Sequence, residues 1–223
     1  MVKPGDEGPS PWSSSGEEDP ESGTERQIFE AADRVFARRG TDGARMQEIA
    51  EEAGVNKALL HYYYRSKRKL AEAVFRRTVE RFVPTVVEIM SSDLDLDQKV
   101  ERVVHGYLDL FSRRPYLPGY LISEITHHPD RLPRLFHAVA GPHFERRVLP
   151  ALKRQIDAGV EEGDIVAIPP EQFLVNVVSL CVFPFAARPM LVLLLGLDEA
   201  GFEAFVEERR RDLPGFVMRA LSP

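Results

Sequence analysis

The sequence contains very little cysteine: Cys181 is the only one in 223 residues. One cysteine cannot form an intramolecular disulfide, and it cannot supply the thiolates of a cysteine-based zinc site. Cys181 stands in an apolar run without a neighbouring base, so we expect a small buried side chain and not a nucleophile. The N-terminus also lacks the apolar run of a secretion signal, which makes a cytoplasmic protein the expectation.

The sequence also lacks the short motifs of common enzymes. It has no G-x-S-x-G, no Walker loop, no G-x-G-x-x-G and no H-E-x-x-H. The stretch "THHPD", with His127, His128 and Asp130, comes nearest to a metal site. Adjacent histidines on a helix diverge by about 100°, however, and rarely bind one ion. We therefore predict no catalytic residues, no metal site and no cofactor.

Positive charge is scarce overall but locally concentrated. The net charge of −6 argues against a polyanionic partner, yet residues 24–81 carry 13 Lys and Arg against nine acidic residues. Binding of a polyanion needs only such a local patch. Residues 1–23 are rich in acid, Pro, Gly and Ser, with one aromatic residue, and this composition predicts a disordered acidic tail.

No stretch alternates in the manner of a β-strand, whereas apolar residues recur at helical spacing from residue 24 onward, so the predicted fold is all-α. The first helix is expected to begin at Thr24, whose spacing to Gln27 fits a capping box, and to end at Gly40. The second stops at Gly54, which suits a left-handed turn, and Asn56 can cap the third. Two short helices joined by such a turn form a helix-turn-helix.

The rest of the chain also has helical patterns. We expect a long helix from Ser66 to about Met90 with a kink at Pro84. Further helices are expected over residues 96–113, 131–161 with an interruption near Gly141 and Pro142, 170–195, and 198–221. The apolar stretch 173–195 has the length of a membrane span, but Asn176, Pro184, Arg188 and Pro189 favour a buried helix or a subunit interface. We predict no membrane partner.

Three motifs stand in register between residues 25 and 75. They are an F-x-x-x-G that ends the first helix, then M-x-E-I-A-x-x-A-G-V, then L-x-Y-Y-Y-x-S-K-x-x-L. Together they resemble the TetR family of bacterial transcription regulators. The resemblance implies an N-terminal three-helix helix-turn-helix DNA-binding domain, residues 24–70, followed by a larger helical ligand-binding and dimerisation domain, residues 71–223. It also implies a homodimer, because two recognition helices meet the two half-sites of a near-palindromic double-stranded DNA operator.

The resemblance implies DNA contacts residue by residue. Expected near base edges are Lys57, Ala58, Leu59 and His61. Expected at backbone phosphates are Tyr62, Tyr63 and Lys67, with Arg45 and Gln47 on the preceding helix. Leu60 and Tyr64 fall at buried positions. The sequence departs from the family at Ala44, where a capping Thr or Ser is common, and at Arg68, where Glu is common.

In the larger domain, aromatic and polar residues are candidates for an effector pocket, and packing is the alternative for each. These candidates are Tyr107, Phe111, Tyr120, Glu124, His127, Phe144, Asn176 and Phe183, and their apolar bias suggests a small hydrophobic or aromatic effector. For a dimer seam the candidates are Val177, Val178, Cys181, Leu191, Leu195, Phe202, Phe205 and Leu213, each of which could equally belong to the internal core.

The predicted function is a DNA-binding transcriptional regulator, a repressor that a small-molecule effector releases from its operator. The helix over residues 67–90 is the expected mechanical link between the two domains. Two alternatives remain. A helical protein-interaction module could use residues 170–221 without DNA affinity, and a small-molecule carrier or enzyme could use the pocket alone.

Overall fold

The computed structural model describes residues 23–223, so all of the predicted acidic tail except Gly23 lies outside the described residues. The described part contains helices and no β-strand, which confirms the all-α prediction. The helices are α1 (Gly23–Gly43), α2 (Met46–Glu52), α3 (Lys57–Tyr63), α4 (Lys67–Ser91), α5 (Leu96–Arg113), α6 (Leu117–His127), α7 (Arg131–His143), the π-helical turn η1 (Phe144–Val148), α8 (Leu149–Glu162), α9 (Pro170–Ala186), α10 (Arg188–Leu195) and α11 (Glu199–Arg219).

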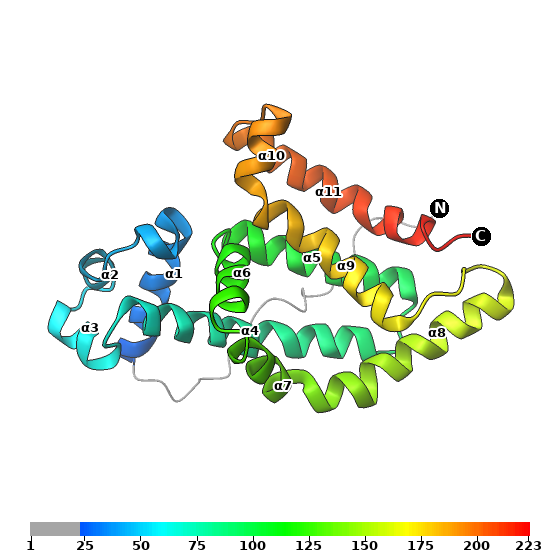
Figure 1. Ribbon diagram of the computed structural model, residues 1–223, viewed down its shortest axis with the longest axis horizontal. Coiled ribbons are helices and arrows are strands. Elements are labelled where there is room, and N and C mark those ends of the chain that lie inside the picture. Colours follow the sequence, from blue (N-terminus) through cyan, green and yellow to red (C-terminus); the bar gives the residue numbers. More distant parts are fainter. Residues whose placement is uncertain (1–22) are drawn as a thin grey trace.

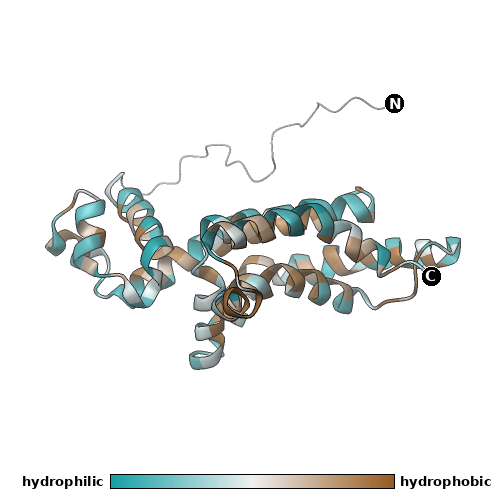
Figure 2. Ribbon diagram, turned by 90° about the horizontal axis from the view of Figure 1, so that it is seen from above, coloured by the Kyte–Doolittle hydropathy of each residue, from teal (hydrophilic) through white to brown (hydrophobic). Residues whose placement is uncertain are grey.

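The helices form a small head, α1 to α3, and a larger body, and α4 leads from one into the other (Figure 1). In the body, α5 is central because it packs against α4, α9 and α11. Hydrophobic residues gather between the helices and hydrophilic residues along their outer faces (Figure 2). The short helix α10 stands at one edge of the body, where it packs on α9 and where its first residue, Arg188, forms an ion pair with Glu199 of α11.

The turns of the head follow from single residues. Gly40 breaks α1 with φ 67°, and Gly54 has the same φ just after α2, a left-handed conformation that glycine adopts without strain. The Asn56 side chain accepts a hydrogen bond from the Leu59 amide at 2.7 Å and so caps α3. These predicted turns are confirmed. The capping box at Thr24 is wrong, because α1 begins at Gly23 and Thr24 lies inside its first turn.

Three predicted helices of the body differ in detail. Helix α4 continues through Pro84. The interruption near Pro142 takes the form of the π-helical turn η1. The single helix predicted over 170–195 is wrong, because α9 and α10 are separate and meet at a bend of 72°. Pro189 explains the break, since a proline disfavours a helical conformation in the residue before it and cannot donate a backbone hydrogen bond. Among the described helices, none alone is long and apolar enough to cross a membrane, and only the bent pair α9 and α10 meets that test jointly.

Aromatic rings link the helices of the body. The ring centroids of successive pairs lie 4.8, 5.8, 5.5, 5.9 and 6.0 Å apart, within the range of favourable aromatic contacts. This chain of rings runs from α4 through α5 and α9 to α11 and consists of Phe82, Tyr107, Phe111, Phe185, Phe202 and Phe205.

One lysine of α5 is buried inside the body. Lys99 has no exposed surface, and its Nζ donates to Gln155 Oε1 on α8 at 2.6 Å. Gln155 Nε2 in turn donates to the carbonyl oxygen of Leu94 at 2.7 Å, so the pair joins α5, α8 and the turn before α5. Burial removes water from the ammonium group and lowers the pKa of Lys99 below its usual 10.5.

This lowered pKa makes stability depend on pH. Between the folded-state and unfolded-state pKa of Lys99 the unfolded chain binds more protons, so the free energy of unfolding should rise as pH approaches 10.5. The rise is at most about 1.4 kcal/mol per pH unit. Urea denaturation from neutral pH to pH 10.5 measures it. Lys99→Met should flatten the rise, and Lys153→Met, at an exposed lysine of α8, should not. Equal slopes for Lys99→Met and the unmodified protein would contradict the prediction.

Candidate functional site

Helix α3 presents one face to solvent and one to the core of the head. Leu60 is fully buried and anchors the helix. Lys57, Ala58 and His61 are exposed, and Leu59 is half-buried. The structure therefore brings the four residues predicted at base edges onto one short helix, with its start held by the Asn56 cap.

The three consecutive tyrosines occupy three different environments. Tyr62 is 80% exposed, Tyr63 is half-buried and Tyr64 is 9% exposed. The Tyr64 hydroxyl donates to Glu25 Oε1 at 2.7 Å, and its ring meets Phe29 edge-on with centroids 5.6 Å apart. The prediction that Tyr64 belongs to the core is confirmed. Tyr62 remains free to reach a ligand outside the head.

The basic residues of α1 bind within the protein. Arg34 and Arg38 each contact Glu52 of α2 at 2.7 Å. Both hydrogen bonds lower the pKa of the Glu52 carboxyl group, and the one from Arg34 has the larger effect. These pairs join α1 to α2. In contrast, Arg45 and Lys57 make no side-chain hydrogen bond or ion pair with any described residue, and both are exposed. Their charge is available to a polyanion at the solvent face of α2 and α3.

Two other residues predicted at phosphates have partners within the head. Lys67 Nζ donates to the carbonyl oxygen of Asp42 at 2.6 Å, near the end of α1. Gln47 Nε2 donates to Glu51 Oε1 at 2.7 Å on the same helix. The structure differs from the expectation at Ala44, because the N-cap of α2 is Arg45, which makes no side-chain cap, and Ala44 is buried one residue before it. The phosphate contacts of Lys67 and Gln47 stay predictions.

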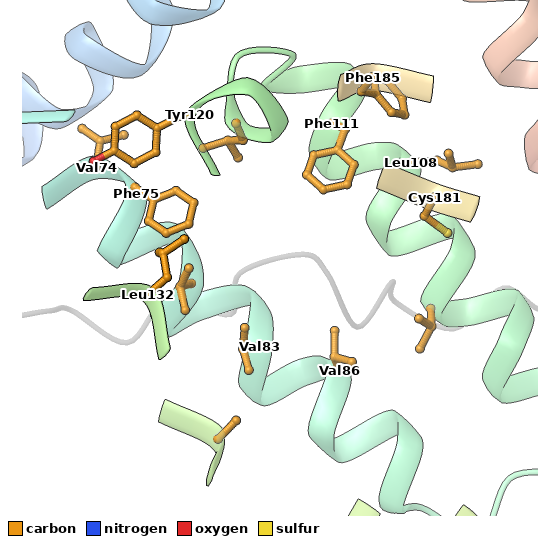
Figure 3. Close-up of a cluster of buried hydrophobic side chains, with 14 of the residues drawn as sticks. Val74, Phe75, Val83, Val86, Leu108, Phe111, Tyr120, Leu132, Cys181 and Phe185 are labelled. Atoms are coloured by element: carbon orange, nitrogen blue, oxygen red, sulfur yellow. The ribbon is translucent and has the colours of Figure 1, made fainter. Parts of the chain in front are cut away.

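The predicted effector residues divide into inward-facing and outward-facing sets. Tyr120 packs on Phe75 of α4 with ring centroids 5.1 Å apart, and Phe111 packs on Phe185 of α9 at 5.5 Å (Figure 3). Four of the predicted residues contribute to the interior, namely Tyr107, Phe111, Tyr120 and Glu124. Phe144 is half-buried, and the three exposed ones are His127, Asn176 and Phe183. The structure therefore does not bring all eight residues to one site.

Phe185 is the interior residue that the sequence prediction missed. Phe183, which is 55% exposed, lies two positions away on α9, and two positions on a helix turn a side chain through about 200°. Phe185 shares its face with Val177 and Cys181, and all three are buried. That i, i+4, i+8 spacing was the available signal. Burial also raises the pKa of the Cys181 thiol to about 12, as expected for an inert buried side chain.

A polar cluster joins α4, α6 and α7. Glu124 is 8% exposed and lies 3.8 Å from Arg131, which also contacts Glu72 of α4 at 3.5 Å. Burial and then the nearby Glu124 charge raise the pKa of the Tyr120 hydroxyl. In residues 23–223 no three His, Cys, Asp or Glu side chains lie together in an arrangement that could hold a metal ion.

The proposed dimer seam needs correction. Val177, Cys181, Phe202 and Leu213 are buried within one chain, so they belong to its own core. Of the predicted residues only Leu195, at 54%, is strongly exposed. Its neighbours on α10 are exposed as well, and we call Met190, Leu193, Leu194 and Leu195 the α10 apolar face. The sequence predicted one continuous helix through Pro189. The bend at this proline directs α10, and with it these residues, away from the axis of α9.

Comparison with known proteins relates the chain, including α2 and α3, to bacterial transcription regulators. The family model described as bacterial regulatory proteins, tetR family, matches residues 28–74, which include α2 and α3. The chain is 30% identical over 185 residues to the HTH-type transcriptional repressor SCO4008 of Streptomyces coelicolor, covering 82% of this chain and 88% of that protein. It is 26% identical over 186 residues to the HTH-type transcriptional repressor NicS of Pseudomonas putida, covering 81% and 84%. The fold is similar to that of the fatty acid degradation regulator FadR from Bacillus halodurans, with a TM-score of 0.58 at 19% identity over 88% of this chain and 97% of that one.

Proposed function

Because the chain belongs to the TetR family of bacterial regulatory proteins, and is thus a DNA-binding transcriptional regulator and not an enzyme, we propose that it is a dimeric repressor released from its operator by a small apolar effector. Two relatives that align over 82% and 81% of this chain are both named as repressors, which supports repression. The proposal includes a cytoplasmic location and a division into a DNA-binding domain, residues 24–70, and an effector and dimerisation domain, residues 71–223.

The solvent face of α3 carries the DNA-binding part of the proposal. A recognition helix enters the major groove with the side chains near its N-terminus close to base edges. Lys57, at the first position of α3, would donate to guanine acceptors, and Leu59 would lie against a thymine methyl group. Tyr62 and Arg45 would hold backbone phosphates on either side, since both are exposed.

A matched pair of lysine variants tests this role. A duplex is first selected from a random pool by the unmodified protein, and its affinity is then measured by fluorescence anisotropy over a salt series. Lys57→Ala should lower the affinity for the selected duplex by about 1–3 kcal/mol and relax selectivity at one base position. Lys153→Ala removes the same charge from the exposed face of α8 and should leave affinity unchanged. If the unmodified protein selects no sequence from the pool, operator binding is ruled out.

Dimerisation supplies the second recognition helix for the second half-site. We propose that the α10 apolar face, with the exposed Val175 and Phe183 of α9 and Phe216 of α11, meets the same surface of a second copy. Single exposed apolar residues are common on protein surfaces. Four on one short helix form a contiguous apolar patch, which is typical of a protein–protein interface.

The effector would enter among the inward-facing aromatic residues. Tyr107, Phe111 and Tyr120 come from the two helices that follow α4 in the chain, and Phe82 and Phe75 from α4 itself pack against them. Glu124 is a polar group at the edge of this region, buried on α6. Displacement of the rings packed on α4 by an apolar ligand would move the helix that carries the head. The DNA assay described above provides the screen for such compounds.

A further inference from the structure

The chain turns a sharp corner between α5 and α6, at residues 114–116. Pro115 disfavours helical geometry in the residue before it, and Arg114 accordingly leaves the helix with φ −132° and ψ 64°. Tyr116 then forms the N-cap position of α6, whose first turn contains Pro118. The sequence R-P-Y therefore produces a rigid corner from which two long polar side chains project.

Both side chains of this corner bind one carboxylate in the head. Arg114 Nε lies 2.9 and 2.7 Å from the two carboxylate oxygens of Asp33 on α1, and its Nη2 lies 2.6 Å from Oδ2. The Tyr116 hydroxyl donates to Asp33 Oδ1 at 2.6 Å. The Arg114 and Asp33 side chains are only 33% and 24% exposed, so water screens this pair less than a surface salt bridge.

Apolar contact accompanies these hydrogen bonds. The Tyr116 ring packs on Phe36 of α1 with centroids 5.7 Å apart, and Phe36 is itself fully buried in the head. Burial first, and the Asp33 charge second, raise the pKa of the Tyr116 hydroxyl, so it stays protonated as a donor. We call Asp33, Arg114 and Tyr116 the corner latch.

We infer that Arg114 and Tyr116, which lie in the body and far from the DNA face of α3, are positioning residues that fix the orientation of the DNA-binding head. Without the latch, the head is attached mainly through α4, on which α1 packs. Bending or twisting of this one connecting helix changes the orientation of the head. A second attachment, through a carboxylate that accepts from both a guanidinium and a phenol, restricts such motion.

The latch also connects the head to the start of α6. At the end of α6 opposite the corner, Glu124 lies within 3.8 Å of Arg131, which contacts Glu72 of α4. Helix α6 is thus bound to α1 at its start and linked to α4 near its end. Displacement of α6 by a ligand beside Tyr120 would therefore act on α1, which belongs to the head, and on α4, which connects the head to the body.

Fixed orientation matters because half-site spacing is a geometric requirement. Recognition helices of a dimer must meet successive major grooves about 34 Å apart. A head that samples several orientations binds the correct spacing less tightly and other spacings relatively better. The effect on half-site spacing rests on the proposed operator binding. The effect of the latch on the orientation of the head is independent of DNA.

The first test measures the head orientation directly and needs neither DNA nor dimer. Spin labels at Glu30→Cys on α1 and Ala158→Cys on α8 report the distance between head and body, in samples diluted with unlabelled protein. Cys181 is fully buried and should not react. The otherwise unmodified chain and Arg113→Gln, a neighbouring exposed arginine, should give one narrow distance distribution. Arg114→Gln and Tyr116→Phe should broaden it. Narrow, unchanged distributions in both variants would overturn the inference, and Tyr116→Phe decides alone if Arg114→Gln does not fold.

The second test uses the selected duplex and a copy with its half-sites one base pair further apart. Arg114→Gln should lower affinity for the selected duplex about tenfold, in the usual range of coupling between distant sites, and should reduce the preference over the respaced duplex. The salt dependence should stay unchanged, because no phosphate contact is lost. Arg114→Lys should recover part of the loss. A fall in affinity equal on both duplexes would show a merely structural role. Failure of the unmodified protein to select DNA would refute the proposed function and leave the distance result to decide on the latch.

Discussion

Replacing Tyr64 with alanine is expected to unfold the DNA-binding head under conditions in which the same change at Tyr62 has no effect on stability. Tyr64 is 9% exposed, its ring packs on Phe29 and its hydroxyl binds Glu25. Removal of a buried aromatic side chain costs about 3–5 kcal/mol, and the partner carboxylate also loses its donor. Tyr62 is 80% exposed, and a surface change of this kind stays within about 0.5 kcal/mol.

The two variants should also differ in how they bind DNA. Tyr62→Ala should weaken binding to all duplexes alike, because a phosphate contact carries no sequence information. Tyr64→Ala should abolish selective binding by loss of the head structure. Urea denaturation and hydrogen exchange of the α1 to α3 amides measure the first effect, and anisotropy measures the second. Equal losses of stability in both variants would show that Tyr62 and Tyr64 share one environment, contrary to the structure.

The head could be predicted closely because its signals are local. Gly54 has the positive φ that its position demands, and Asn56 caps the helix that follows. Each of these features depends on residues within one turn of the chain. The burial of Leu60 and Tyr64 agrees with what the TetR resemblance implies for these two positions. The capping box at Thr24 failed because residue spacing alone does not determine where a helix begins.

The body was harder to predict because its apolar residues have several possible partners. Residues 173–195 are apolar almost throughout, so the i, i+4, i+8 face of Val177, Cys181 and Phe185 does not stand out from the apolar residues around it, and the break before α10 depends on one proline. For the same reason the exposed Phe183 was named as a pocket candidate and the buried Phe185 was not. The sequence left each seam candidate open between a partner chain and the internal core, and four of them are buried within their own chain.

The corner latch lay beyond prediction from sequence. Asp33 and Arg114 are 81 residues apart, and neither stands in a motif that requires an ion pair. Local patterns do show that Pro115 ends a helix, but they do not show which surface the resulting corner faces. That depends on the path of α4, which sets where the head meets the body. Contacts between domains thus require the tertiary structure, even where each domain is recognisable.

The second large effect is expected from a charge on the α10 apolar face. Leu193 is 81% exposed in the single chain, so Leu193→Glu should leave the free energy of unfolding of the monomer unchanged. If this leucine is buried in the dimer, each copy loses about 1.5–3 kcal/mol of apolar burial. Two copies per dimer then raise the dissociation constant about two to four orders of magnitude. Sedimentation equilibrium measures this shift.

Loss of the dimer should also weaken operator binding. A monomer presents one recognition helix, so Leu193→Glu should bind the selected duplex no better than a single half-site, with the DNA face of α3 intact. Val160→Glu provides the control, because Val160 is also exposed but lies on α8, at the opposite end of the body from α10 (Figure 1). It should remain dimeric and keep its affinity. A dimeric Leu193→Glu protein with full operator affinity would exclude α10 from the seam and would leave the exposed residues of α9 and α11 as the surface where the two copies meet.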